Sequence, residues 1–292
     1  MGPLLCLLSA ACFGAMGIFG KFAYDAGVSP SALLLVRFSM AAVVLAGLLA
    51  LRPVARPPRG AVLTALALGA VGFATQATLY FEALRVMDAS LLSLILYTYP
   101  LMVTAAAVLL GRDRMTRGRG IALAVASAGT LLVLLGAGGG AVSPLGAVLG
   151  FGSAITYTVY ILTSDRVVHR VPPVLLSALV MAGAAVALTG KSLVTGGVDL
   201  AFGPAGWLWV SGIVLVSTVL ATLTFFAGLR RTGPSTAAIL STVEPVITTA
   251  LAAVTLGELL TPAQLSGGLL VLSSVAVLQI RPAGKAEPAL VA

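Results

Sequence analysis

FAGLRRTGPSTAAILSTVEPVITTALAAVTLGELLT occupies residues 226–261, and FEALRVMDASLLSLILYTYPLMVTAAAVLLGRDRMT occupies residues 81–116. The two stretches align without a gap at a constant offset of 145 residues. The offset superimposes proline, arginine, serine and threonine residues, which coincide by chance less readily than abundant apolar ones: Arg85 with Arg230, Ser90 with Ser235, Pro100 with Pro245, Thr104 with Thr249 and Thr116 with Thr261. The chain therefore contains an internal duplication.

The composition around these stretches indicates a lipid environment. The chain has 292 residues, of which 59% are hydrophobic and 9% charged, whereas a soluble domain carries about 25% charged residues. So few charges cannot cover the surface of a water-soluble fold, so we expect an integral membrane protein. The net charge of +8 is then explained by basic loops on the cytoplasmic side, and nucleic acid is not an expected partner.

Ten segments are apolar over roughly the 20 residues that a helix needs to cross the hydrocarbon core. They are residues 4–24, 31–51, 61–82, 90–110, 119–136, 145–164, 173–190, 206–228, 235–256 and 264–280. The predicted fold class is therefore all-α integral membrane, with ten transmembrane helices. Five helices in each copy place the copies in opposite senses, so we predict two inverted repeats, residues 1–140 and 141–282, and a short cytoplasmic tail at residues 283–292.

Basic residues predict the orientation, because they collect in cytoplasmic loops. With a cytoplasmic N-terminus, the loops and tail on that side hold Arg52, Arg56, Arg59, Arg112, Arg114, Arg117, Arg119, Arg166, Arg170, Arg230, Arg231, Arg281 and Lys285. The opposite side holds only Lys21, Arg85 and Lys191. We therefore expect both termini to lie in the cytoplasm, with the chain in the inner (plasma) membrane.

The motifs that carry the duplication resemble those of the EamA domain. In the first copy these are Tyr80 to Arg85, followed by a polar turn and an apolar helix with a central Pro100, and Arg37-Phe38 fits the same pattern. In the second copy they are residues 226–230, 243–246 and 256–258. The resemblance covers nearly the whole chain and implies a member of the drug/metabolite transporter superfamily, with ten helices and cytoplasmic termini. Such members are similar to exporters of amino acids and other metabolites.

One acidic residue is expected at the depth of the bilayer midplane. Glu244 lies about nine residues, or roughly 14 Å, into the ninth predicted helix, where an ionised group is costly. It would bind a substrate amine or couple transport to protons; the alternative is a structural role, for example as a partner of Arg37. Tyr99 stands at the equivalent position of the first copy, so the halves differ chemically.

Two prolines, Pro100 and Pro245, lie close to the predicted depth of the bilayer midplane and predict hinges. Pro100 and Pro245 cannot donate to the helix ladder, which frees the carbonyl groups of Leu96 and Ser241. Kinked helices with free carbonyls at mid-depth suit a polar cavity between two halves.

Further candidates for substrate binding are polar or aromatic residues within the predicted helices: Arg37, Gln76, Tyr80, Tyr97, Tyr99, Thr156 and Tyr157. Arg37 would bind a substrate carboxylate, or else extend outward to the interface or pair with an acid such as Glu82. The tyrosines would line a pocket for an apolar or aromatic solute, or else form hydrogen bonds between helices. The glycines Gly14, Gly17 and Gly20 favour close helix packing.

Enzymatic chemistry is not indicated. His169, the one histidine, lies in a loop without a catalytic or metal-ligating set, and Cys6 and Cys12 fit small packing residues, so we expect no cofactor and no metal. The sequence predicts a secondary transporter, an exporter that moves small organic metabolites such as amino acids by alternating access. Its partners would be that substrate and the lipid bilayer, and a homodimer stays open. The rival hypotheses are a non-transporting membrane scaffold and a solute channel.

Overall fold

The computed structural model is helical, with no strand in the part of the chain that it describes. That part comprises residues 1–51, 54, 57–84, 86, 92, 95–136, 143–256 and 259–280. Several residues named above lie outside the described residues: Arg52, Arg56, Arg85, Ser90, Gly257, Glu258, Arg281, Lys285 and the predicted tail at 283–292.

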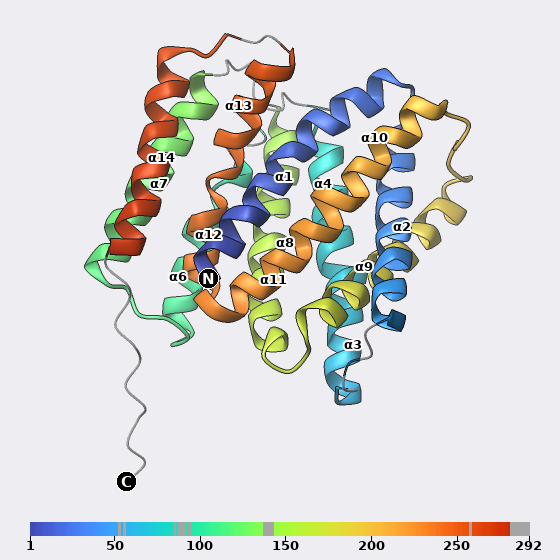
Figure 1. Cartoon of the computed structure of the whole chain (residues 1–292), viewed down its shortest axis with the longest axis horizontal. Coiled ribbons are helices and arrows are strands. Elements are labelled where there is room, and N and C mark those ends of the chain that lie inside the picture. The colour runs from blue at the N-terminus through green and yellow to red at the C-terminus, as the bar shows by residue number, and fades with distance from the viewer. Residues whose placement is uncertain are drawn as a thin grey trace.

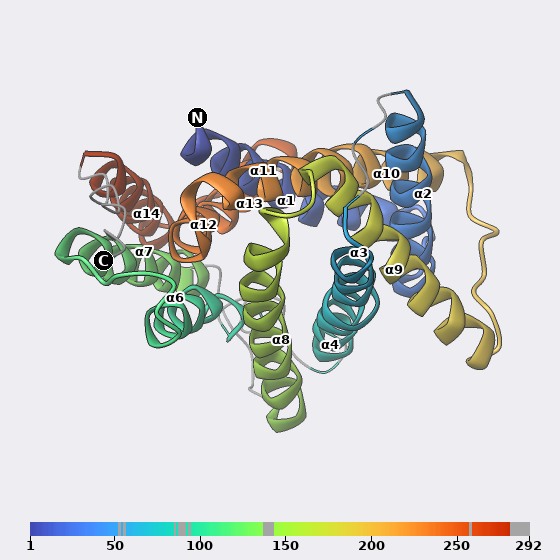
Figure 2. The same ribbon diagram turned by 90° about the horizontal axis from the view of Figure 1, so that it is seen from below.

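The first half of the chain contains α1 (Gly2–Asp25), α2 (Pro30–Leu51), α3 (Arg59–Ala67), η1 (Leu68–Phe73), α4 (Ala74–Leu84), α6 (Tyr99–Leu109) and α7 (Arg117–Gly136). The second half contains α8 (Pro144–Val168), α9 (Pro173–Val194), α10 (Pro204–Val214), η2 (Leu215–Leu220), α11 (Ala221–Thr232), α12 (Pro234–Ser241), α13 (Glu244–Leu256) and α14 (Pro262–Ile280). Figures 1 and 2 show α1 crossing the centre of the assembly, with α7 and α14 paired at one edge and α2, α9 and α10 at the other.

Eight of the described helical segments are long and apolar enough to cross a membrane, and two shorter apolar helices, Tyr99–Leu109 and Pro262–Val277, accompany them. Large apolar side chains face outward over much of the surface; Val43, Val148 and Leu269 are 72%, 70% and 70% exposed. Such a surface is stable in lipid and not in water. The predicted all-α membrane fold is confirmed, while the count of ten spans and the inverted repeats stay predictions.

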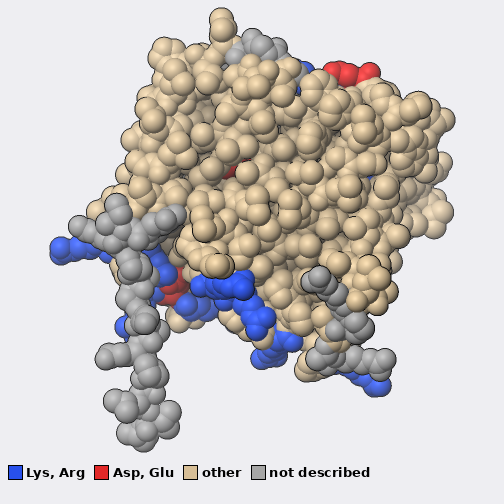
Figure 3. Space-filling model, viewed as in Figure 1, with Lys and Arg blue, Asp and Glu red and all other residues tan. Residues whose placement is uncertain are grey.

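Charged side chains gather at one edge of the molecule. Figure 3 shows lysine and arginine along the lower edge, where Figure 1 places the start of α3, the end of α11 and the connection from α6 to α7. The N-terminus and the end of α14 also lie toward this edge.

The fourth and ninth predicted helices are interrupted at matching positions. A turn at Tyr97 and Thr98 precedes α6, and a turn at Thr242 and Val243 precedes α13. Tyr99 and Glu244, the first residues of the restarted helices, are 145 residues apart, which is the offset of the sequence duplication. The sequence predicted a kink at each site, and the structure shows a two-residue turn there.

A proline explains each break. Pro100 and Pro245 are the second residues of α6 and α13, where the missing N–H does no harm. Four residues earlier, the carbonyl groups of Leu96 and Ser241 lose the amide that a continuous helix would supply.

The third and eighth predicted helices each contain a π-helical stretch. These stretches, η1 (Leu68–Phe73) and η2 (Leu215–Leu220), have six residues each. The sequence predicted continuous α-helices over both, because π-helical turns use the same apolar residue types. Such turns occur frequently at functional sites.

Two equivalent hydrogen bonds connect the halves. The Ser9 hydroxyl on α1 donates to the carbonyl of Ala221 on α11 at 2.8 Å, and the Ser153 hydroxyl on α8 donates to the carbonyl of Gln76 on α4 at 3.1 Å. The two acceptors are 145 residues apart. Each bond therefore joins the first helix of one half to the third helix region of the other.

Close backbone contact holds α9 against α3 and η1. A methyl group on Gly183 would overlap the carbonyl oxygen of Leu66 and lie 3.0 Å from the amide nitrogen of Ala70. Gly69 meets α9 in the same way, since an added Cβ would lie 2.9 Å from the nitrogen of Ala184. Small residues permit this approach in membrane helices.

We predict that Gly183→Ala lowers the free energy of unfolding by about 1–3 kcal/mol, because backbone atoms cannot move aside for the methyl group. Gly190→Ala is the matched control on the same helix, since an added Cβ there meets nothing within 4 Å. Thermal unfolding of both purified variants in detergent checks this. Equal melting temperatures for Gly183→Ala and wild type would contradict the packing described.

Candidate functional site

A buried arginine lies between the two π-helical segments. Arg37 on α2 is 3% exposed, and its Nε donates to the Thr218 hydroxyl of η2 at 2.8 Å. Its guanidinium carbon lies 5.9 Å from the ring centroid of Phe73 in η1 and 5.0 Å from that of Phe38. Arg37 is therefore held inside the helix bundle, and the expectation that it extends outward to the interface is wrong.

Thr218 is itself fixed by η2. Its hydroxyl donates to the carbonyl of Ile213, five residues earlier, at 2.9 Å. The oxygen can therefore accept from Arg37 while giving its own proton to the backbone. The Arg37 Nε is the guanidinium nitrogen held in this way.

The two terminal nitrogens of the Arg37 guanidinium are not engaged. Among the hydrogen bonds and ion pairs of the described residues, none involves these nitrogens. A guanidinium fork with both ends available matches the geometry of a carboxylate.

Glu244 is the first residue of α13 and lies within electrostatic range of Arg37. The Tyr97 hydroxyl donates a hydrogen bond to its carboxylate, and the positive charge of Arg37 acts on it. No ion pair joins Arg37 to Glu244 in the described part of the chain. The two opposite charges therefore lie near one another without closing into a salt bridge.

The helix breaks contact each other across the centre. Tyr97, from the turn before α6, bonds Glu244, and the hydroxyl of Tyr99 bonds that of Ser241 at the end of α12. Each pair takes one residue from each half of the chain. Tyr99 is buried, with 2% of its surface exposed, whereas Glu244 is partly accessible.

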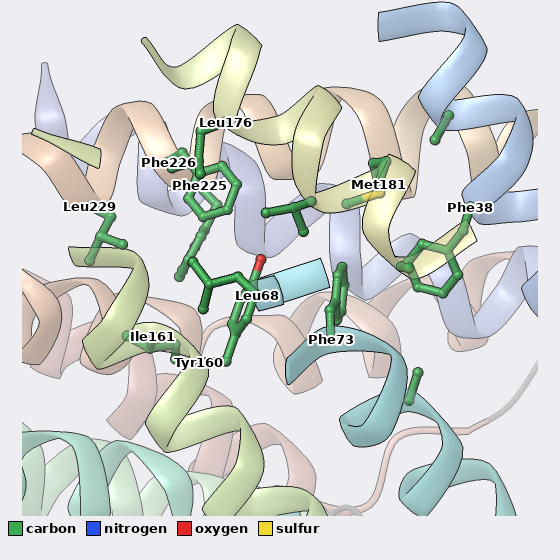
Figure 4. Close-up of a cluster of buried hydrophobic side chains, with 14 of the residues drawn as sticks. Phe38, Leu68, Phe73, Tyr160, Ile161, Leu176, Met181, Phe225, Phe226 and Leu229 are labelled. Carbon is green, nitrogen blue, oxygen red and sulfur yellow. The ribbon is translucent and has the colours of Figure 1, made fainter. Parts of the chain in front are cut away.

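Aromatic rings form a continuous row from Tyr97 to Arg37. Successive ring centroids lie 6.1 Å apart for Tyr97 and Tyr99, 4.7 Å for Tyr99 and Tyr157, and 6.0 Å for Tyr157 and Tyr160. The row continues through Phe73 to Phe38, with separations of 5.3 Å and 5.2 Å. Figure 4 shows Tyr160 and Phe73 facing each other, with Phe38 beyond them.

The other predicted site residues, Gln76, Thr156 and Tyr80, make contacts within or between helices. The Gln76 side-chain amide donates to the Ser153 hydroxyl at 3.1 Å, and the Thr156 hydroxyl donates to the carbonyl of Gly152 in its own helix at 2.7 Å. Tyr80 is partly buried and packs edge-on against Phe81 at 5.4 Å. The interior thus brings together Arg37, Glu244, Tyr97, Tyr99 and Tyr157, while Gln76 lies at the contact between α4 and α8.

Three contributors were not in the predicted set. Tyr24 on α1 lies within electrostatic range of Arg37 and Tyr80; Thr218 binds Arg37, and Phe73 covers its guanidinium. The sequence does give a signal for Thr218, because it is a polar residue within the eighth predicted helix, at residues 206–228. Phe73 is one of many apolar residues in its segment and gives no signal.

The glycines of α1 bring it directly against α13. A Cβ on Gly14 would lie 2.9 Å from the Glu244 carbonyl oxygen, and the Thr248 hydroxyl donates to the carbonyl of Gly14 at 2.9 Å. An added Cβ on Gly17 would lie 3.3 Å from the Thr248 methyl, whereas one on Gly20 meets nothing within 4 Å. The packing role predicted for Gly14 and Gly17 is confirmed, and that for Gly20 is wrong.

Two cavities of the described part lie away from these residues. One, of about 520 Å³, is lined by residues of α1, α9 and α11, and the other, of about 570 Å³, by residues around the start of α3 and the end of α2.

The central arrangement can hold a small zwitterion. Glu244 offers a carboxylate to an amine, the two free nitrogens of Arg37 offer donors to a carboxylate, and the aromatic row offers an apolar wall. Among the described residues no three His, Cys, Asp or Glu side chains group as metal ligands would.

Comparisons with known proteins agree with a membrane transporter. The model of the EamA-like transporter family matches residues 1–135 and 144–280. A Bacillus subtilis protein named uncharacterized transporter YcbK is 30% identical over 281 residues, covering 91% of this chain and 88% of that protein. An uncharacterized transporter of Archaeoglobus fulgidus is 28% identical over 227 residues, 78% of each chain. One solved crystal structure, at 20% identity, has a TM-score of 0.83 and covers 96% of this chain and 98% of its own, so it shares the fold.

We predict that Thr218→Val lowers the free energy of unfolding by about 1–3 kcal/mol, because a buried charged donor loses its acceptor. Thr222→Val is the matched control: Thr222 is also buried, one turn further on, and within the described residues its hydroxyl has no hydrogen-bond partner. Thermal unfolding in the same detergent compares the two. Equal losses of stability would show that the bond to Arg37 contributes nothing.

Proposed function

The chain belongs to the EamA-like transporter family, and from this premise we propose that it exports small organic metabolites such as amino acids across the inner membrane. It is a multi-pass membrane transporter. The proposal adds the substrate class, the direction and the mode of transport, which is alternating access driven by a solute or proton gradient.

The observation that carries the substrate class is the pair of opposite, unbridged charged groups in the interior, the buried Arg37 and the partly accessible Glu244. Isolated charges inside a membrane protein are costly and are retained where they meet a partner or a solute. Arg37 and Glu244 act on one another, yet no ion pair joins them within the described residues. A zwitterionic solute would neutralise both, with its ammonium group at Glu244 and its carboxylate at the terminal nitrogens of Arg37.

The aromatic row would then select the rest of the solute. Tyr97 and Tyr157 are partly accessible and lie beside the two charges, close to Tyr99. An apolar or aromatic side chain would gain contact with these rings. A strongly polar side chain would lose water there without replacement hydrogen bonds.

Alternating access is supported by the symmetry of the contacts. The helix breaks before Tyr99 and Glu244, and the bonds from Ser9 and Ser153, recur at offsets of 145 residues and 144 residues. Inverted repeats that meet at broken helices are typical of transporters that rock around a central site.

The orientation proposed for both termini is cytoplasmic. The edge that carries most of the arginines also carries the N-terminus and the end of α14 (Figures 1 and 3). Positive residues accumulate on the cytoplasmic side of membrane proteins.

One observation favours a non-transporting scaffold instead, namely that the two cavities described above lie away from Glu244. A scaffold, however, would satisfy its interior polar groups internally. In the described residues the terminal nitrogens of Arg37 have no protein partner, which favours a solute. Turnover rate would distinguish a channel from a carrier.

We predict that the reconstituted protein shows saturable counterflow of neutral, apolar amino acids, and that Glu244→Gln reduces it at least tenfold. The substitution removes the charge that would bind the ammonium group and keeps the size of the side chain. Counterflow of radiolabelled solute into liposomes, with expression and melting temperature matched, measures the effect.

Asp199→Asn is the control, because Asp199 is exposed in the loop before α10; it should transport like wild type. Counterflow at the wild-type rate in Glu244→Gln would remove this carboxylate from the mechanism, and the absence of counterflow for every amino acid tested would remove the proposed substrate class.

A further inference from the structure

A groove outside the central site combines apolar walls with a basic rim. Its volume is about 520 Å³, and it lies between α1, α9 and α11. Leu5, Val174, Leu223 and Ala227 contribute apolar surface, and Arg230 and Arg231 close one end.

The two arginines are available to an anion. Both are exposed, in the last turn of α11. Arg231 donates from Nη1 to the carbonyl of Ala227 at 2.8 Å, and Arg230 has no hydrogen bond or ion pair within the described residues. The lining residues include no acidic side chain, so two adjacent positive charges lie in the groove without compensation.

A helix start adds to the same positive field. α9 begins at Pro173, and Pro173 and Val174 both line the groove. The first amides of a helix have no intrahelical acceptor, and the helix dipole is positive at this end. The arginines and the start of α9 therefore favour negative charge at one end of the groove.

The opposite end lies deeper in the membrane span. Leu223 precedes Arg230 by seven residues, which is roughly 10 Å along a helix. Leu223, Ala227 and Arg230 share one face of α11 because they follow helical spacing. The groove thus runs from a charged rim, at the edge where basic residues gather (Figure 3), into the apolar zone.

From this arrangement we propose that the groove binds an acidic phospholipid, with the phosphate at Arg230 and Arg231 and an acyl chain against Leu5, Leu223 and Ala227. A free anion would leave the apolar walls uncovered, and a neutral lipid would leave the arginines uncompensated. α1 belongs to the first half of the chain and α9 and α11 to the second, so the lipid would bridge the halves. The proposal does not rest on the substrate or direction of transport.

The test is native mass spectrometry of the full-length protein in detergent, titrated with dioleoyl-phosphatidylglycerol or dioleoyl-phosphatidylcholine. We expect wild type to bind the first phosphatidylglycerol roughly thirtyfold more tightly than phosphatidylcholine, given the usual effect of two basic residues near anionic lipid. Arg230→Gln/Arg231→Gln should abolish this preference. Arg114→Gln/Arg117→Gln, which alters two exposed arginines elsewhere in the chain, should keep it.

A groove-filling variant tests the acyl-chain part separately. Ala227→Trp retains both arginines and should weaken phosphatidylglycerol binding severalfold while the melting temperature stays within a few degrees. Equal binding of the two lipids by wild type, or equal loss in both double variants, would overturn the proposal. So would complete displacement of the lipid by millimolar inorganic phosphate together with unchanged binding by Ala227→Trp, since the site would then hold an anion alone.

Discussion

The placement of ionisable groups inside a lipid-facing bundle is the constraint on which this structure depends. A membrane interior offers no water to an unpaired charge, so each charge needs a protein partner, a solute or a wet passage. Arg37 meets this constraint partly: Thr218 accepts from Nε, and the rings of Phe38 and Phe73 cover the guanidinium carbon. Glu244 also meets it partly: the Tyr97 hydroxyl donates a hydrogen bond to its carboxylate, and the more distant positive charge of Arg37 acts on it. The terminal nitrogens of Arg37 could bind the carboxylate of a zwitterion, and the Glu244 carboxylate could bind its ammonium group.

The irregular backbone of the protein is concentrated around these charges. η1 supplies Phe73, η2 supplies Thr218, and the breaks before α6 and α13 supply Tyr99 and Glu244. Irregular backbone at membrane depth is tolerated where protein or a cavity covers it. Straight helices such as α7 and α14 lie at the periphery (Figures 1 and 2), so the regular elements enclose the site and the irregular ones build it.

Much of this architecture could be predicted from the sequence because its causes are local. Apolar length predicted the membrane helices, and Pro100 and Pro245 predicted where two of them bend, since proline acts on its own helix. The contacts of the site could not be predicted, because they depend on how helices distant in the sequence pack. Arg37 and Thr218 are 181 residues apart, and Gln76, a predicted binding residue, bonds Ser153 on another helix. The π-helical turns have no residue signature at all.

The central claim is that Glu244 borders a chamber that solute and water can enter. Its most direct test is the reactivity of a Glu244→Cys variant in oriented membrane vesicles, with the buried Cys6 and Cys12 replaced by alanine. A small, membrane-impermeant thiosulfonate should modify the cysteine from at least one side, and a transported amino acid should slow the reaction. Absence of modification from either side, in a variant that folds normally, would mean that the centre is sealed and would contradict the account.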